Sequence, residues 1–80
     1  MKYNPGVTIK DEYKFFMTTY RAKIKSHIYF LSELAAVFNM SDSEMQEYKY
    51  HLTHLDNYCS LFNAILGRKL STKEFTKIFQ

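Results

Sequence analysis

Residues 17–38 read MTTYRAKIKSHIYFLSELAAVF, and residues 45–66 read MQEYKYHLTHLDNYCSLFNAIL. In both stretches mostly apolar residues recur at alternating steps of 3 and 4, the spacing along the contact side of helices that pack side by side. The two series comprise Met17, Tyr20, Ile24, His27, Leu31, Leu34 and Phe38, and then Met45, Tyr48, Leu52, Leu55, Cys59, Phe62 and Leu66. Because only a short break separates them, the sequence predicts an antiparallel helical hairpin. The expected facing pairs are Met17–Leu66, Ile24–Cys59, Leu31–Leu52 and Phe38–Met45.

Two capping boxes predict where helices begin. In the sequence SDSE at 41–44, the Ser41 hydroxyl can accept the N–H of Glu44, and the Glu44 carboxylate can accept the N–H of Ser41. The sequence STKE at 71–74 repeats this pattern with Ser71 and Glu74. We therefore expect a second helix to begin after Ser41 and a short third helix to begin after Ser71.

Residues that favour helix ends complete the predicted boundaries. Asn39 tolerates the left-handed cap conformation, and Gly67 prefers it. The chain is expected to be one all-α domain over 1–80, with an extended arm at 1–8 and helices at 9–38, 42–66 and 72–79. Helix 3 should cover Tyr13 and Phe16, where helix 1 extends past its partner.

Composition and cysteine content limit the compartment. Cys59 is the only cysteine, so the chain has no internal disulfide, which fits a reducing compartment. The N-terminal residues lack the apolar core of a secretory signal. The most apolar stretch, 28–38, is too short to span a membrane and contains Glu33. We expect a cytoplasmic protein that makes no membrane contact.

Helix 1 carries more apolar surface than the hairpin can cover. Ile28, Tyr29, Phe30 and Val37 all lie off the contact series. A helix that is apolar nearly all round is normally buried all round, so these four residues predict an oligomer or partner interface. We expect a homodimer that forms a helical bundle. The alternative is that helix 3 or the N-terminal residues fold over this surface.

Charge is distributed unevenly along the chain. Residues 1–29 carry 6 basic and 2 acidic side chains, residues 30–60 carry 1 and 5, and residues 61–80 carry 4 and 1. Folding the hairpin should bring the two basic segments together. The side chains expected to bind an anionic partner are Lys14, Arg21, Lys25, Arg68, Lys69 and Lys73. Such a cluster suits an acidic protein surface or a nucleic-acid-containing complex, although charged helix faces often serve solubility alone.

The histidines are the residues most suggestive of chemistry. His51 and His54 are 3 apart, a spacing that can place two imidazoles on one metal, and a site from His27, Asp56 and Cys59 is conceivable. We instead expect His27 to be a polar residue in the contact seam, hydrogen-bonded to Asp56, where it fixes register at a cost in stability. His27→Leu should then raise thermal stability. We assign no metal ligand, cofactor or catalytic residue, and expect Cys59 to be an inert core thiol.

These features together favour a binding protein over an enzyme. A thin hairpin offers no deep cleft, and the sequence carries no nucleotide-binding or nucleophile motif. The expected function is that of a small regulatory adaptor or inhibitor that binds a larger protein or protein–nucleic-acid complex, with no small-molecule substrate. Sequence-independent nucleic-acid binding by the basic segments is the alternative.

Overall fold

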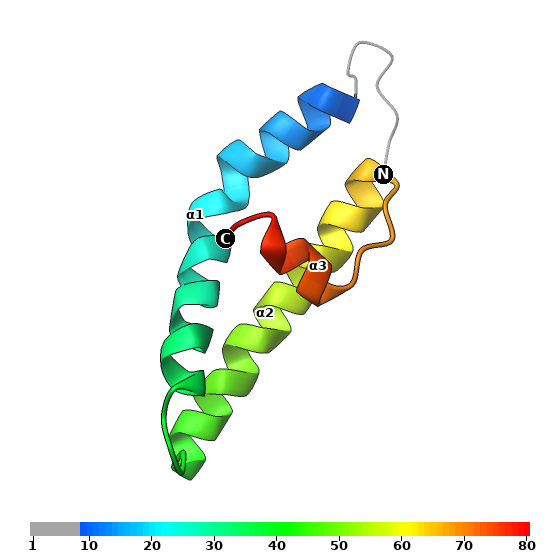
Figure 1. The fold of residues 1–80 in the computed structure, drawn as a ribbon. Helices are drawn as coiled ribbons and strands as arrows, with labels where there is room; N and C mark the ends of the chain where they lie inside the picture. The colour runs from blue at the N-terminus through cyan, green and yellow to red at the C-terminus, as the bar shows by residue number, and fades with distance from the viewer. Residues whose placement is uncertain (1–8) are drawn as a thin grey trace.

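The computed structural model describes residues 9–80, and the arm expected at 1–8 lies outside them. Three helices follow one another: α1, Ile9–Ala35; α2, Asp42–Leu66; and α3, Thr72–Lys77 (Figure 1). No strand occurs in the described part of the chain, so the predicted all-α class is confirmed. The helices α1 and α2 run antiparallel as a hairpin, and together with α3 they give an elongated shape of 51 × 17 × 17 Å (Figure 1).

Both predicted capping boxes are present. Ser41 Oγ accepts the N–H of Glu44 at 3.2 Å, and Glu44 Oε1 accepts the N–H of Ser41 at 2.9 Å. Ser71 and Glu74 form the same pair at 3.2 and 3.0 Å. The hydrogen bond from the Ser41 N–H lowers the pKa of Glu44, and the hydrogen bond from the Ser71 N–H lowers the pKa of Glu74. Gly67 ends α2 in the left-handed conformation, with a φ of 62°.

The first helix ends at Ala35 rather than at residue 38. The next two N–H groups bond to carbonyls three residues back, so the chain tightens as helix ends often do. Asn39 then turns the chain with a φ of 61°. Phe38 consequently lies outside the helix and is 90% exposed, and its predicted packing against Met45 is wrong.

The contact seam of α2 differs from the predicted one toward the turn. The buried residues of this helix are His51, Leu55, Cys59, Phe62 and Leu66. Leu52 was expected in the seam but is 38% exposed, and His51 takes the inward position. A straight α-helix drifts by about 20° per heptad from a 3.5-residue repeat, so two heptads from Leu66 the predicted seam residue Leu52 lies about 40° away from the direction of Leu66.

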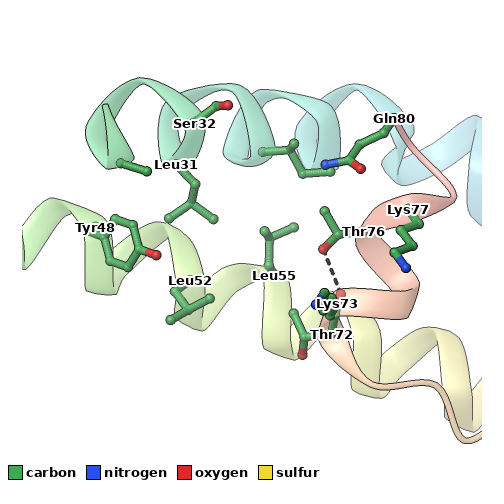
Figure 2. Close-up of a pocket in the computed structure, with 12 residues that line it drawn as sticks. Leu31, Ser32, Tyr48, Leu52, Leu55, Thr72, Lys73, Thr76, Lys77 and Gln80 are labelled. Atoms are coloured by element: carbon green, nitrogen blue, oxygen red, sulfur yellow. Dashed lines mark hydrogen bonds between the residues drawn. The ribbon is translucent and has the colours of Figure 1, made fainter. Parts of the chain in front are cut away.

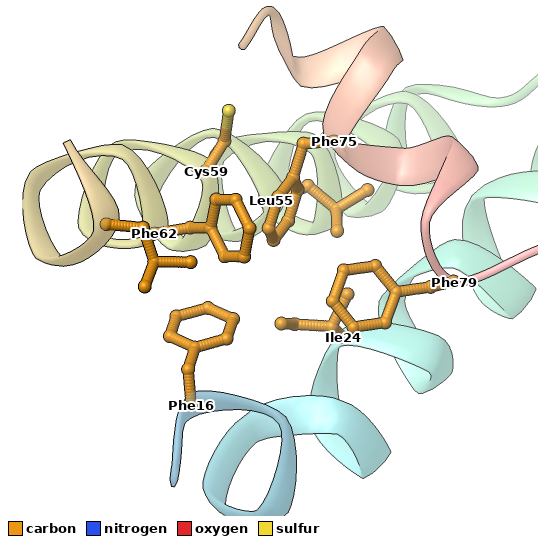
Figure 3. Packing of buried hydrophobic residues seen from close by; sticks show 8 residues of the cluster. Phe16, Ile24, Leu55, Cys59, Phe62, Phe75 and Phe79 are labelled. Atoms are coloured by element: carbon orange, nitrogen blue, oxygen red, sulfur yellow. The ribbon is translucent and has the colours of Figure 1, made fainter. Parts of the chain in front are cut away.

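The third helix closes the core where α1 and α2 diverge (Figure 1). Phe75 of α3, and Phe79 just beyond the end of this helix, pack in one core cluster with Phe16 of α1 and Phe62 of α2 (Figure 3). The Phe75 ring lies 5.3 Å from that of Phe62 and 6.3 Å from that of Phe16. Phe16 and Phe75 are both fully buried, which confirms the predicted cover of Phe16, whereas Tyr13 remains 39% exposed. The helix itself ends at Lys77, before the predicted residue 79.

Hydrogen bonds fix the position of α3 along the hairpin. The Asn63 amide donates to the Leu70 carbonyl at 2.9 Å and accepts the Leu70 N–H at 3.0 Å. Cys59 Sγ donates to the same carbonyl at 3.3 Å. Thr72 Oγ1 donates to Asp56 Oδ1 at 2.6 Å. These hydrogen bonds hold the start of α3 beside the middle of α2, so the third helix lies partway along the hairpin.

Candidate functional site

A groove with a mainly apolar lining lies between α1 and α2 on the turn side of α3 (Figure 2). It has a volume of ≈ 470 Å³ and is open to solvent along one side. Its floor is formed by Ile28, Leu31, Ala35, Tyr48, Leu52 and Leu55. Leu55 is buried and Leu31 is half-buried, whereas Leu52 is 38% exposed. We call this surface the interhelical groove.

The rim of the interhelical groove is polar and comes largely from α3. Thr72, Lys73, Thr76 and Lys77 line it from this helix. The threonine hydroxyls are engaged within the protein, since Thr72 Oγ1 donates to Asp56 and Thr76 Oγ1 donates to the Thr72 carbonyl at 2.7 Å. The two lysines are therefore the charged groups that the rim presents to a bound molecule (Figure 2).

The predicted basic residues of α1 lie close together. Lys14 and Arg21 line a hollow of ≈ 590 Å³ that also includes Ile78 from the end of the chain. Arg21 and Lys25 line an adjacent hollow of ≈ 530 Å³. Because Ile78 follows α3 directly, these basic side chains lie near α3, as does the interhelical groove. Arg68 and Lys69 are exposed in the connection between α2 and α3 and line none of these hollows.

The four residues predicted as an oligomer or partner interface lie in different surroundings. Ile28 is half-buried and lines the interhelical groove. Tyr29 and Phe30 are 59% and 42% exposed, with ring centroids 5.5 Å apart. Phe30 stacks on the ring of His51 at 5.2 Å. Val37 is exposed and follows the end of α1.

The three histidines form a cluster beside Phe30. His27 Nδ1 lies 2.8 Å from His51 Nδ1, so one ring donates a hydrogen bond and the other accepts it. The ring of His54 stacks on that of His27 at 5.0 Å, and Glu47 Oε1 lies 3.8 Å from His51 Nε2. Burial, followed by the charges of His54, His51 and Lys23, lowers the pKa of His27. His27 thus pairs with His51 and not, as predicted, with Asp56, which accepts a hydrogen bond from Thr72.

The residues considered for metal or thiol chemistry do not converge. Among residues 9–80 no group of three or more His, Cys, Asp and Glu side chains is placed to hold a metal ion. Cys59 is buried against the Leu70 carbonyl, and this burial raises the pKa of its thiol. A protonated, enclosed thiol is a poor nucleophile, so this side chain contributes packing and a hydrogen bond.

The described chain is thus a small helical hairpin with an open apolar groove bordered by lysines. Within residues 9–80, no helix has the length and apolar character needed to cross a membrane. Comparison of the chain with protein-family models, with curated proteins and with solved structures gave no match. What can be inferred about function therefore comes from the side chains described above.

Proposed function

We propose that this chain is a small, non-catalytic regulatory adaptor or inhibitor of the cytoplasm that binds a larger protein or a protein–nucleic-acid complex. One observation supports this most directly. The basic side chains of α1 lie near α3, and the interhelical groove, with its two α3 lysines, adjoins the same helix. An apolar surface flanked by charges of one sign suits a protein partner of the opposite sign, since burial supplies affinity and charge steers the encounter.

Affinity capture from an extract of the native host tests this function. The matched proteins are the wild type, the double variant Arg21→Glu/Lys25→Glu, and the control Lys49→Glu. Lys49 is an exposed α2 residue outside the hollows described above. We expect a host protein that binds the wild type and the control and is lost with the double variant, while circular dichroism of all three is unchanged. Equal capture by all three would contradict the proposed role of the basic residues.

A homodimer is part of the proposal. Tyr29 and Phe30 support it, because both aromatic side chains remain partly exposed to solvent in the single chain. Phe30→Asp should convert a dimer to a monomer by light scattering at tens of micromolar protein. A wild type that is monomeric at that concentration would refute the homodimer without affecting the proposed adaptor function.

Direct nucleic-acid binding is the second candidate, supported by the clustering of Lys10, Lys14 and Arg21 around one hollow. Asp11 lines the same hollow, and a carboxylate there disfavours a phosphate, which is why we place this function second. A mobility-shift assay with duplex and single-stranded DNA and RNA separates the two. Binding through six or more phosphates should fall roughly a thousandfold between about 50 and 200 mM salt. Absence of any shift at micromolar protein removes this candidate.

A further inference from the structure

The third helix shows that the space between α1 and α2 can hold a short helix. It is a short amphipathic helix of 6 residues, Thr72–Lys77. Phe75 of this helix and Phe79, two residues past its end, belong with Phe16 and Phe62 to the buried core between α1 and α2 (Figure 3). The interhelical groove lies next to this core on its turn side and is bordered by α3 (Figure 2).

The dimensions of the groove floor match a helix of about two turns. On α1 the floor runs from Ile28 to Ala35, which corresponds to about 10 Å at 1.5 Å per residue. On α2 it runs from Tyr48 to Leu55 over the same number of residues. An apolar floor of this length accepts two large side chains four residues apart, which is the spacing of Phe75 and Phe79 in the neighbouring half.

The charge of the rim selects among possible occupants. Lys73 and Lys77 are the only charged residues that line the interhelical groove within residues 9–80. The α3 helix of a second copy would bring the same two lysines against them, and like charges oppose that docking. A nucleic-acid backbone would satisfy the lysines but leave the apolar floor exposed. An amphipathic helix with acidic residues beside its apolar side satisfies both parts.

We propose that the interhelical groove binds a short acidic amphipathic helix of a partner protein, with apolar side chains against Leu31 and Leu52 and carboxylates beside Lys73 and Lys77. This inference rests on the proposed adaptor function and names the chemistry of its partner. Contacts in the groove would supply most of the binding free energy, and the basic residues of α1 would further attract the same acidic partner.

A designed peptide provides the probe. It repeats residues 70–80 with glutamate in place of both lysines, so it keeps the two phenylalanines and reverses the charge. Titration into the full-length protein, followed by methyl NMR, should give saturable shifts at Leu31 and Leu52 with a dissociation constant on the order of 100 µM. The peptide with its original lysines should bind at least about tenfold more weakly.

Two variants and a control define the site. The double variant Lys73→Glu/Lys77→Glu should bind the glutamate peptide about tenfold more weakly and the lysine peptide more tightly than the wild type does. Leu52→Asp should abolish both interactions, and Lys49→Glu should change neither. The two lysines are exposed, so their reversal remains informative if Leu52→Asp does not fold.

Several results would overturn the inference. These are no saturable shift up to about 1 mM peptide, shifts confined to residues outside the groove, or binding that requires removal of residues 1–8, which would make the chain's own arm the occupant. Self-association that covers Leu52 would make a second copy the occupant. If the peptide fails but host capture remains sensitive to Arg21→Glu/Lys25→Glu, the groove inference fails and the adaptor function stands.

Discussion

Replacing His27 and His51 by leucine, singly and together, tests what holds the turn half of the hairpin together. The two rings share one hydrogen bond, with their Nδ1 atoms 2.8 Å apart. His51 is 8% exposed and His27 is half-buried, so the two ends of this bond differ in their access to water. The contribution of the pair therefore depends on which partner is removed.

The free energies of unfolding should follow a definite order. His27→Leu leaves the buried Nδ1 of His51 without its partner, and an unsatisfied buried polar group costs about 1–3 kcal/mol. His51→Leu should cost less, because the Nδ1 of His27 can reach water. The double variant replaces both polar ends by apolar ones and should be about as stable as the wild type or more stable. The expected coupling energy is about 1–3 kcal/mol. The sequence-based expectation that His27→Leu alone is stabilising is thereby reversed.

Protonation adds a second readout. Burial and the neighbouring charges of His54, His51 and Lys23 lower the pKa of His27 below its ordinary value of 6.5. The unfolded chain then binds this proton more readily than the folded chain. The contribution to stability is complete above pH 6.5 and is lost as pH falls from there toward the lowered folded pKa. The double variant should lack this part of the pH dependence.

Urea denaturation followed by circular dichroism, at about pH 8 and about pH 5, measures both effects. The wild type, both single variants and the double variant complete the cycle. If the single effects add to within about 0.5 kcal/mol, the hydrogen bond between the rings does not contribute to stability. An unchanged pH dependence in the double variant would equally refute the assignment of that dependence to His27.

Three further measurements test the core, the helix start and the thiol. Phe75→Ala should cost about 3–5 kcal/mol in urea denaturation, a large part of the roughly 4–12 kcal/mol typical of a domain this size, whereas Phe38→Ala should change stability by less than about 0.5 kcal/mol; equal effects would contradict the placement of both rings. Ser41→Ala should cost about 1 kcal/mol at neutral pH, and this cost should shrink as acid protonates Glu44, whose pKa is lowered by the cap; a constant cost would argue against the capping box. Cys59 should react slowly with a disulfide reagent in buffer and rapidly in urea, and fast labelling of the folded protein would contradict its burial.

The helix starts were predictable from sequence because their determinants are local. A capping box needs only Ser41 and Glu44, or Ser71 and Glu74, at the right spacing, and both boxes are present in the structure. The early end of α1 could not be predicted in the same way. Nothing near Ala35 breaks a helix, and the chain leaves it through a tight turn that depends on where α2 must begin.

The candidate site could not be foreseen because it depends on how three helices are placed together. The buried position of His51 in place of Leu52 depends on how α2 is rotated against α1, which a heptad pattern does not specify. The position of α3 depends on the hydrogen bonds of Asn63 with Leu70, residues whose pairing no local motif announces. With α3 anchored beside the middle of α2, part of the space between α1 and α2 is left open, and that opening is the interhelical groove.

Photo-crosslinking from the interhelical groove tests whether this groove binds an acidic helix of a partner protein. A benzophenone amino acid is placed at Leu52 in the groove or, as the control, at exposed Ser60 of α2, and the protein is irradiated in extract of its native host. We predict that position 52 crosslinks to an acidic amphipathic helix of one host protein, that excess glutamate peptide blocks this product, and that position 60 gives none. Crosslinks from position 52 only to nucleic acid or to a second copy of the chain, or the same products from both positions, would contradict the account.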